Sequence, residues 1–68
     1  LSRKQKKLMA IAVAASMRDS HAVHAQLQGA KNLGITLGEV DEALRVAFML
    51  AGMPAYVYGK TAAESIFK

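Results

Sequence analysis

The chain of 68 residues contains no cysteine and no tryptophan, and it has only one proline and four aromatic residues, two tyrosines and two phenylalanines. Without cysteine, a disulfide framework, a thiolate zinc site and any sulfur-based nucleophile or redox couple are excluded. The absence also fits a reducing compartment, so we expect a cytoplasmic protein. No apolar run approaches the roughly 18 residues that a membrane span requires, and we expect no membrane partner.

Small apolar residues dominate what is present. Hydrophobic residues make up 53% of the chain, which excludes a disordered tail. A domain this small buries only about 60% of its unfolded surface, and alanine contributes little burial per residue. We therefore expect residues 1–68 to form one domain, either complete or the ordered core of a longer chain, that gains stability by packing against copies of itself.

The positive charge is concentrated at one end. Four of the nine cations lie between residues 3 and 7, and the other five are balanced by five carboxylates, which accounts for the net charge of +4. This basic segment either meets a phosphate or another anionic group or, the interpretation favoured by the sequence, forms a solvated helix face. Neither interleaved aromatic residues nor a glycine-rich loop accompany it, so no nucleic-acid partner is expected.

Helix start and stop signals divide the chain into four helical segments and leave no strand pattern. Ser2 is placed to cap a first helix that fades near Met17. Asp19 or Ser20 begins a second helix, and Gly34 ends it in the left-handed conformation common at helix ends.

The remaining boundaries come from a capping box and a proline. Thr36 and Glu39 form the Thr-x-x-Glu pattern that opens a third helix, which runs to about Ala51. The fourth helix is predicted from about Ala55 to Phe67, after the single proline. The fold class is therefore all-α. The short connections predict that the second and third helices form an antiparallel hairpin flanked by the other two.

The segment Asp19–His24 is the only one with evident chemical potential. His21 and His24 lie one helical turn apart on one face, and Gln28 follows four residues after His24. Two imidazoles at this spacing are able to exchange protons with a substrate, bind an anion or share a metal, and they are also common as plain surface residues. No pattern designates a third ligand, so we expect neither a metal nor a cofactor.

Gly29 lies inside the second helix, where glycine costs about 1 kcal/mol relative to alanine. A close contact between helices is the justification that we expect for it.

Four segments carry a common pattern: Lys7–Ala14, Ala30–Thr36, Glu39–Leu44 and Ala51–Ala55. Each segment is a weak signal alone, but their order and spacing are fairly specific from Ser2 to Phe67. Together they resemble the carboxymuconolactone decarboxylase-like family, whose superfamily includes the alkylhydroperoxidase AhpD and spans lyases and oxidoreductases. The resemblance implies an all-helical, AhpD-like domain that forms homotrimers or hexamers.

The resemblance carries little of the family's chemistry with it. The peroxidases use a Glu, a Cys-x-x-Cys pair and a His, and these positions fall here at Lys7, Asp19, Ala22 and Gln26. Thiol peroxidase activity is therefore excluded. In the decarboxylase branch, one of three histidine positions is kept, at His21.

Two hypotheses follow from these residues. In the first, the protein acts on a small organic acid or lactone, with His21 and His24 as catalytic proton-transfer groups and Gln26 or Gln28 orienting the substrate. In the second, the chain is a non-catalytic oligomeric binding module that keeps the fold after losing the family's reactive groups.

Overall fold

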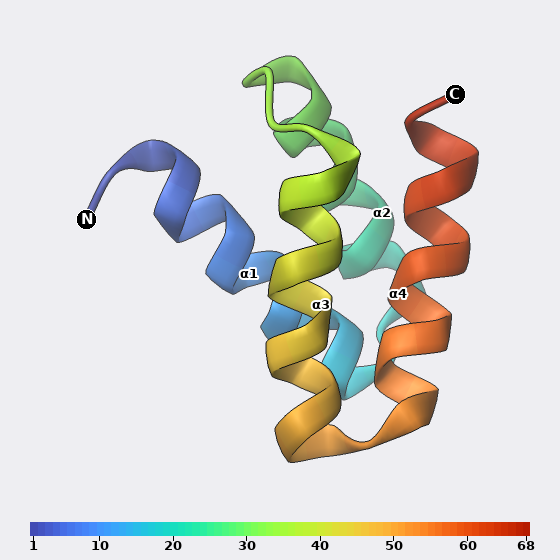
Figure 1. Ribbon diagram of the computed structural model, residues 1–68. Coiled ribbons are helices and arrows are strands. Elements are labelled where there is room, and N and C mark those ends of the chain that lie inside the picture. Colours follow the sequence, from blue (N-terminus) through green and yellow to red (C-terminus); the bar gives the residue numbers. More distant parts are fainter.

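The computed structural model describes all 68 residues and contains four α-helices and no strand, which confirms the all-α prediction. No helix is both long and apolar enough to cross a membrane. The helices run in the order shown in Figure 1: α1 Arg3–Met17, α2 Ser20–Asn32, α3 Leu37–Ala51 and α4 Met53–Ile66.

The predicted starts of the first three helices are confirmed by their hydrogen bonds. The Ser2 hydroxyl accepts the Gln5 N–H at 2.9 Å while the Gln5 side chain accepts the Ser2 N–H, so α1 opens with a capping box. The Thr36–Glu39 box opens α3 in the same way. At α2 the Asp19 carboxylate accepts the Ala22 N–H at 3.1 Å. These caps fix the helix ends through local sequence alone.

One residue separates α3 from α4. Gly52 has a φ of +88°, a conformation that residues with a Cβ rarely adopt. Pro54 lies in the first turn of α4, where its missing N–H leaves no bond unmade. The fourth helix therefore begins at Met53, two residues before the predicted start at Ala55.

The predicted hairpin of the second and third helices is wrong, because α2 and α3 make no contact. Instead, α3 and α4 run antiparallel side by side, and α1 contacts all three other helices (Figure 1). The short connection brings only the ends of α2 and α3 together. Packing of the apolar faces then decides the neighbours, and α1 and α4 come to lie between α2 and α3.

The core draws on all four helices and on one loop residue, Ile35. Gly59 of α4 has a packing role in it, because a Cβ there would collide with the Leu44 side chain and lie 3.2 Å from the Ala15 Cβ. No polar or charged side chain is buried. The largest fully buried side chains are Ile11, Val23, Leu27, Val40 and Leu44, and alanines fill the spaces between them.

Candidate functional site

The two predicted catalytic histidines lie at the start of α2, and both are exposed. The His24 Nδ1 lies 2.9 Å from the Ser20 carbonyl oxygen one turn earlier. A carbonyl only accepts hydrogen bonds, so Nδ1 carries the proton in this contact, and Nε2 makes no hydrogen bond within the chain. The His21 side chain makes no hydrogen bond within the chain.

His24 lies on the wall of an open groove of about 680 Å³ between the start of α2 and α4. Hydroxyl groups and one guanidinium make up most of the polar lining, and no carboxylate takes part. Such a lining offers donors and a positive charge to an acidic ligand. The lining residues are Arg18, Ser20, His24, Pro54, Val57, Tyr58, Thr61, Ala62 and Ser65.

Arg18 holds an unusual backbone conformation in this groove. Its φ of +56° makes it the one non-glycine residue of the chain with positive φ. A side chain in the left-handed region costs about 1–2 kcal/mol relative to glycine, and glycine is the usual residue where a helix ends. Because arginine stands where glycine would be unstrained, we expect the Arg18 side chain to have a role that glycine could not fill. Sequence reasoning missed Arg18, although the lack of glycine between two adjacent helices is a signal that could have found it.

The two predicted substrate-binding glutamines lie in different surroundings. Gln28 is exposed, and its side-chain amide lies 3.4 Å from the Asn32 side-chain oxygen. Gln26 is half-buried and accepts a 2.8 Å hydrogen bond from the Lys7 ammonium of α1. Neither glutamine lines the His24 groove.

The contact between Lys7 and Gln26 joins two of the positions that the family resemblance singles out. Ala22, a third, lines with Gln26 a shallow hollow of about 410 Å³ between α1 and α2. Three of the four positions that the resemblance assigns to reactive groups therefore lie near one another here, and a lysine, a glutamine and an alanine occupy them.

A charged cluster across α3 and α4 was not predicted. The Asp41 carboxylate accepts hydrogen bonds from the Lys60 ammonium at 2.7 Å, from the Tyr56 hydroxyl and from the Arg45 guanidinium at 2.7 Å. Lys60, and then Tyr56 and Arg45, hold the pKa of Asp41 well below its ordinary value. The carboxylate in turn raises the pKa of Lys60 and that of Arg45.

Nothing in the sequence singled out Asp41. The spacing of Tyr56 and Lys60, one turn apart, was a visible signal, but their partner lies on another helix. No residue of the cluster lines any of four surface cavities of about 410–680 Å³, so its geometry fits a link between helices rather than a ligand site.

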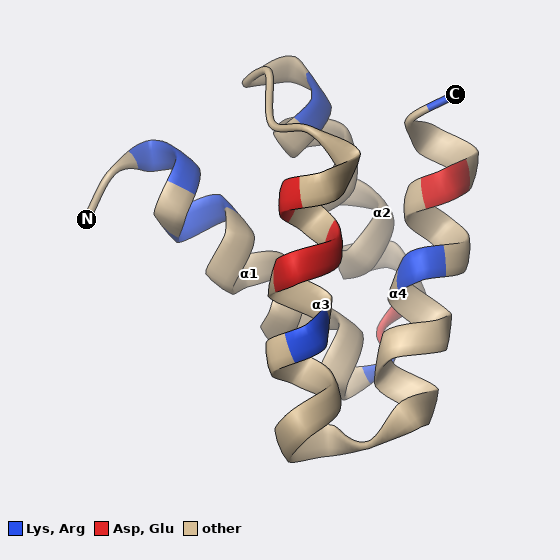
Figure 2. Cartoon of the chain, viewed as in Figure 1, with Lys and Arg blue, Asp and Glu red and all other residues tan.

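No group of three histidine, aspartate or glutamate side chains lies close enough together to hold a metal ion. Figure 2 shows how the charges are distributed over the helices. Basic residues gather at the start of α1, acidic residues gather in the first half of α3, and the remainder are scattered.

Comparison with known proteins adds to this geometry. Two relatives are uncharacterized proteins of Methanocaldococcus jannaschii: one is 44% identical over 82% of this chain and 55% of its own length, the other 32% identical over 84% and 53%. The chain thus spans about half the length of these curated relatives. No solved structure matches it. The model of the carboxymuconolactone decarboxylase family matches residues 1–65, and with the four-helix fold this shows that the chain belongs to the carboxymuconolactone decarboxylase family.

Proposed function

We propose that the protein acts on a small organic acid or lactone by proton transfer in the groove of His24, as a cytoplasmic homo-oligomer. The observation that carries the proposal is the pairing of a free imidazole nitrogen with a guanidinium in one groove that holds no carboxylate. The guanidinium of Arg18 binds the substrate carboxylate, and the His24 Nε2 takes up or returns a proton.

The proton transfer balances without a cofactor. A proton leaves a carbon next to a carbonyl group for Nε2, the electron pair of the broken C–H bond forms a C=C bond, and the carbonyl π pair moves to the oxygen to give an enolate. The Ser20 carbonyl, which accepts the Nδ1 proton, stabilises the imidazolium that forms. His21 supplies the second imidazole, and Gln28, one turn beyond His24 on the same helix face, orients the part of a substrate that extends past the groove. Gln26 lies on the α1 side of the helix, bonded to Lys7, and takes no part in this site.

The experiment follows this proton. Exchange of the acidic C–H of 2-oxobutyrate in D2O, measured by NMR with and without the protein, reports the transfer directly. We expect His24→Ala to lower the protein-dependent rate by about a hundredfold and His21→Ala to lower it less. Lys68→Gln, which removes an exposed terminal cation, serves as the control. Unchanged exchange in the His21→Ala/His24→Ala double variant would remove the histidines from the mechanism.

A substitution at Arg18 tests the proposal with a variant that we expect to fold. Arg18→Gly relieves the positive φ, so the variant should be at least as stable as the parent protein. We expect it to raise the KM for 2-oxobutyrate with a smaller change in kcat, because the guanidinium binds the carboxylate in both the ground and transition states. An unchanged KM would exclude Arg18 as the carboxylate ligand.

A non-catalytic oligomeric binding module is the second candidate, and a separate observation favours it. Large apolar side chains are exposed along α1, where Met9, Val13 and Met17 recur every four residues, and at the end of α3, where Met49 and Leu50 are 80% and 87% exposed. A monomer rarely leaves this much apolar surface in contact with water. These faces are suited to packing against further copies of the chain.

Light scattering tests the assembly, and we expect a trimer or hexamer. Leu50→Lys should shift it toward smaller species, while Leu1→Lys, at an equally exposed residue outside these faces, should not. A stable monomer at micromolar concentration would contradict self-association. An oligomer that supports no C–H exchange with organic acids would favour the binding module over the enzyme.

A further inference from the structure

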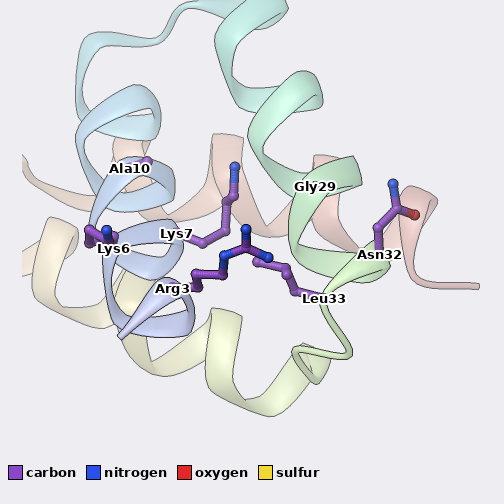
Figure 3. A pocket seen from close by; sticks show the side chains of 7 residues that line it. All are labelled: Arg3, Lys6, Lys7, Ala10, Gly29, Asn32 and Leu33. Atoms are coloured by element: carbon purple, nitrogen blue, oxygen red, sulfur yellow. The ribbon is translucent and has the colours of Figure 1, made fainter. Parts of the chain in front are cut away.

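A second cleft, of about 430 Å³, opens between the start of α1 and the end of α2. In Figure 3, Arg3 and Lys7 reach from α1 into the space between the two helices, and Gly29 and Asn32 of α2 and the following residue Leu33 form the other side. The cleft shares no residue with the His24 groove. Its full lining is Arg3, Lys6, Lys7, Ala10, Gly29, Asn32 and Leu33.

Lys7 is held in this cleft rather than left free in solvent. Its side chain is half-buried, and its ammonium donates to the Gln26 side-chain oxygen at 2.8 Å. Fixing a lysine side chain costs rotamer entropy, and the hydrogen bond from the charged Lys7 ammonium to Gln26 offsets a cost of that size. The ammonium has two further protons available for a ligand.

Gly29 provides the space that Lys7 occupies. A Cβ at Gly29 would lie 3.0 Å from the Lys7 Nζ and 3.3 Å from its Cε. The glycine is not required by its backbone, because positive φ among the glycines is confined to Gly34 and Gly52. The helix contact that the sequence predicted for Gly29 is therefore a contact with a charged side chain. Glycine at this helix position costs about 1 kcal/mol relative to alanine, and it leaves space for the Lys7 ammonium group.

The three cations of the cleft have no carboxylate to neutralise them. The ion pairs of the chain engage Lys4, Arg45 and Lys60, and none includes a cation of the cleft. Arg3 and Lys7 point into the cleft, whereas Lys6 lies on the outer side of α1 and the Asn32 side chain is directed away from both (Figure 3). The like charges repel one another, and an anion placed between Arg3 and Lys7 attracts both of them.

We propose that this cleft binds a small anion that carries two or more negative charges, a phosphate or a polycarboxylate. The Arg3 guanidinium binds two of its oxygens, the Lys7 ammonium binds a third, and Lys6 adds charge at the rim. Phosphate and polycarboxylate oxygens present the same acceptors to these donors. This site stands apart from the proton transfer proposed at His24.

Titration of the full chain by NMR at low ionic strength tests the site, with inorganic phosphate, citrate and acetate as probes. We expect phosphate or citrate to shift the amide signals of Gly29, Asn32 and Leu33, and acetate to bind more weakly than either. The tighter of the two multivalent anions identifies the chemical class. Equal affinity for acetate and for both multivalent anions would overturn the proposal.

Matched variants separate a site from general charge attraction. Lys7→Gln should weaken binding of the preferred anion by about tenfold, whereas Lys68→Gln, with the same change in net charge, should leave it within about twofold. Gly29→Leu keeps every charge but fills the cleft, and leucine is favourable in a helix, so binding should be lost in a folded protein. Equal effects of Lys7→Gln and Lys68→Gln, or unchanged binding in Gly29→Leu, would overturn the site.

His24→Ala keeps the two proposals distinguishable. We expect it to leave phosphate and citrate binding unchanged, because no residue of the His24 groove lines this cleft. Loss of anion binding in His24→Ala would place the anion in the other groove and overturn the assignment to Lys7.

Discussion

The seam between α3 and α4 and the cleft between α1 and α2 are built from the same two kinds of residue with opposite results. Each has a glycine inside a helix and a lysine beside it. At the α3–α4 seam, Leu44 fills the space left by Gly59, and the Asp41 carboxylate neutralises Lys60. At the α1–α2 cleft, Lys7 itself fills the space left by Gly29, and no carboxylate faces it.

The difference shows how one residue type serves stability in one place and recognition in another. When an apolar side chain fills the space beside a helical glycine, the contact extends the core. When an ammonium group fills that space, a charge enters a partly enclosed site. A lysine paired with a carboxylate has its charge satisfied, whereas an unpaired one keeps its charge for a ligand. Three predictions test this contrast.

The largest effect is expected at the two glycines. Gly59→Ala should lower the free energy of unfolding by about 1–3 kcal/mol, because its Cβ collides with the buried Leu44 side chain. Gly29→Ala should change it by at most about 1 kcal/mol, and upward, since alanine favours the helix and the flexible end of Lys7 moves aside. Chemical denaturation followed by circular dichroism, at one protein concentration, measures both. Equal losses in the two variants would contradict the contrast.

A smaller effect, with a defined pH dependence, is expected at Asp41. Asp41→Asn removes a carboxylate that Lys60, Tyr56 and Arg45 contact, so the variant should melt at a lower temperature at neutral pH. The pKa of Asp41 is lowered in the folded protein from its ordinary value of 3.8. Its contribution is therefore fully present above that value and is lost as the pH falls through the lower folded pKa.

Thermal melts of the parent protein and of Asp41→Asn from neutral to acid pH check this sign. The difference between their melting temperatures should be constant above about pH 5 and shrink on further acidification. A difference in melting temperature that grows in acid would mean that Lys60 and Arg45 do not stabilise the ionised Asp41 carboxylate.

The smallest effect is expected at the ion pair between Lys4 of α1 and Glu39 of α3. The two side chains are 50% and 33% exposed, and an ion pair this accessible to water and salt contributes little. Lys4→Gln should therefore melt within error of the parent protein. A loss as large as that of Asp41→Asn would show that the exposed pair matters as much as the cluster at the seam.

Features that depend on nearby residues were predictable from the sequence. The caps at Ser2, Asp19 and Thr36 are hydrogen bonds across three residues, and the positive φ of Gly34 follows from the residue type. The pairing of Asp41 with Tyr56 and Lys60 was not predictable, because it spans 15 and 19 residues and depends on how two helices face each other.

The candidate site was also predictable only where it depends on nearby residues. The sequence placed His21 and His24 on one helix face but gave no sign of the groove that His24 shares with Arg18, since its walls come from α4. The basic segment at the start of α1 was interpreted as a solvated face. Lys7 departs from that interpretation only because Gly29 of another helix leaves space for it.

The sequence by itself determined four helices, their ends and an alanine-rich core, because hydrogen-bonded caps and apolar spacing act over a few residues. Only the tertiary structure decided that α1 and α4 separate α2 from α3, which lysine meets a carboxylate and which remains unpaired. Those outcomes depend on the fit of whole helix faces, and a change of neighbour alters every contact along a face at once.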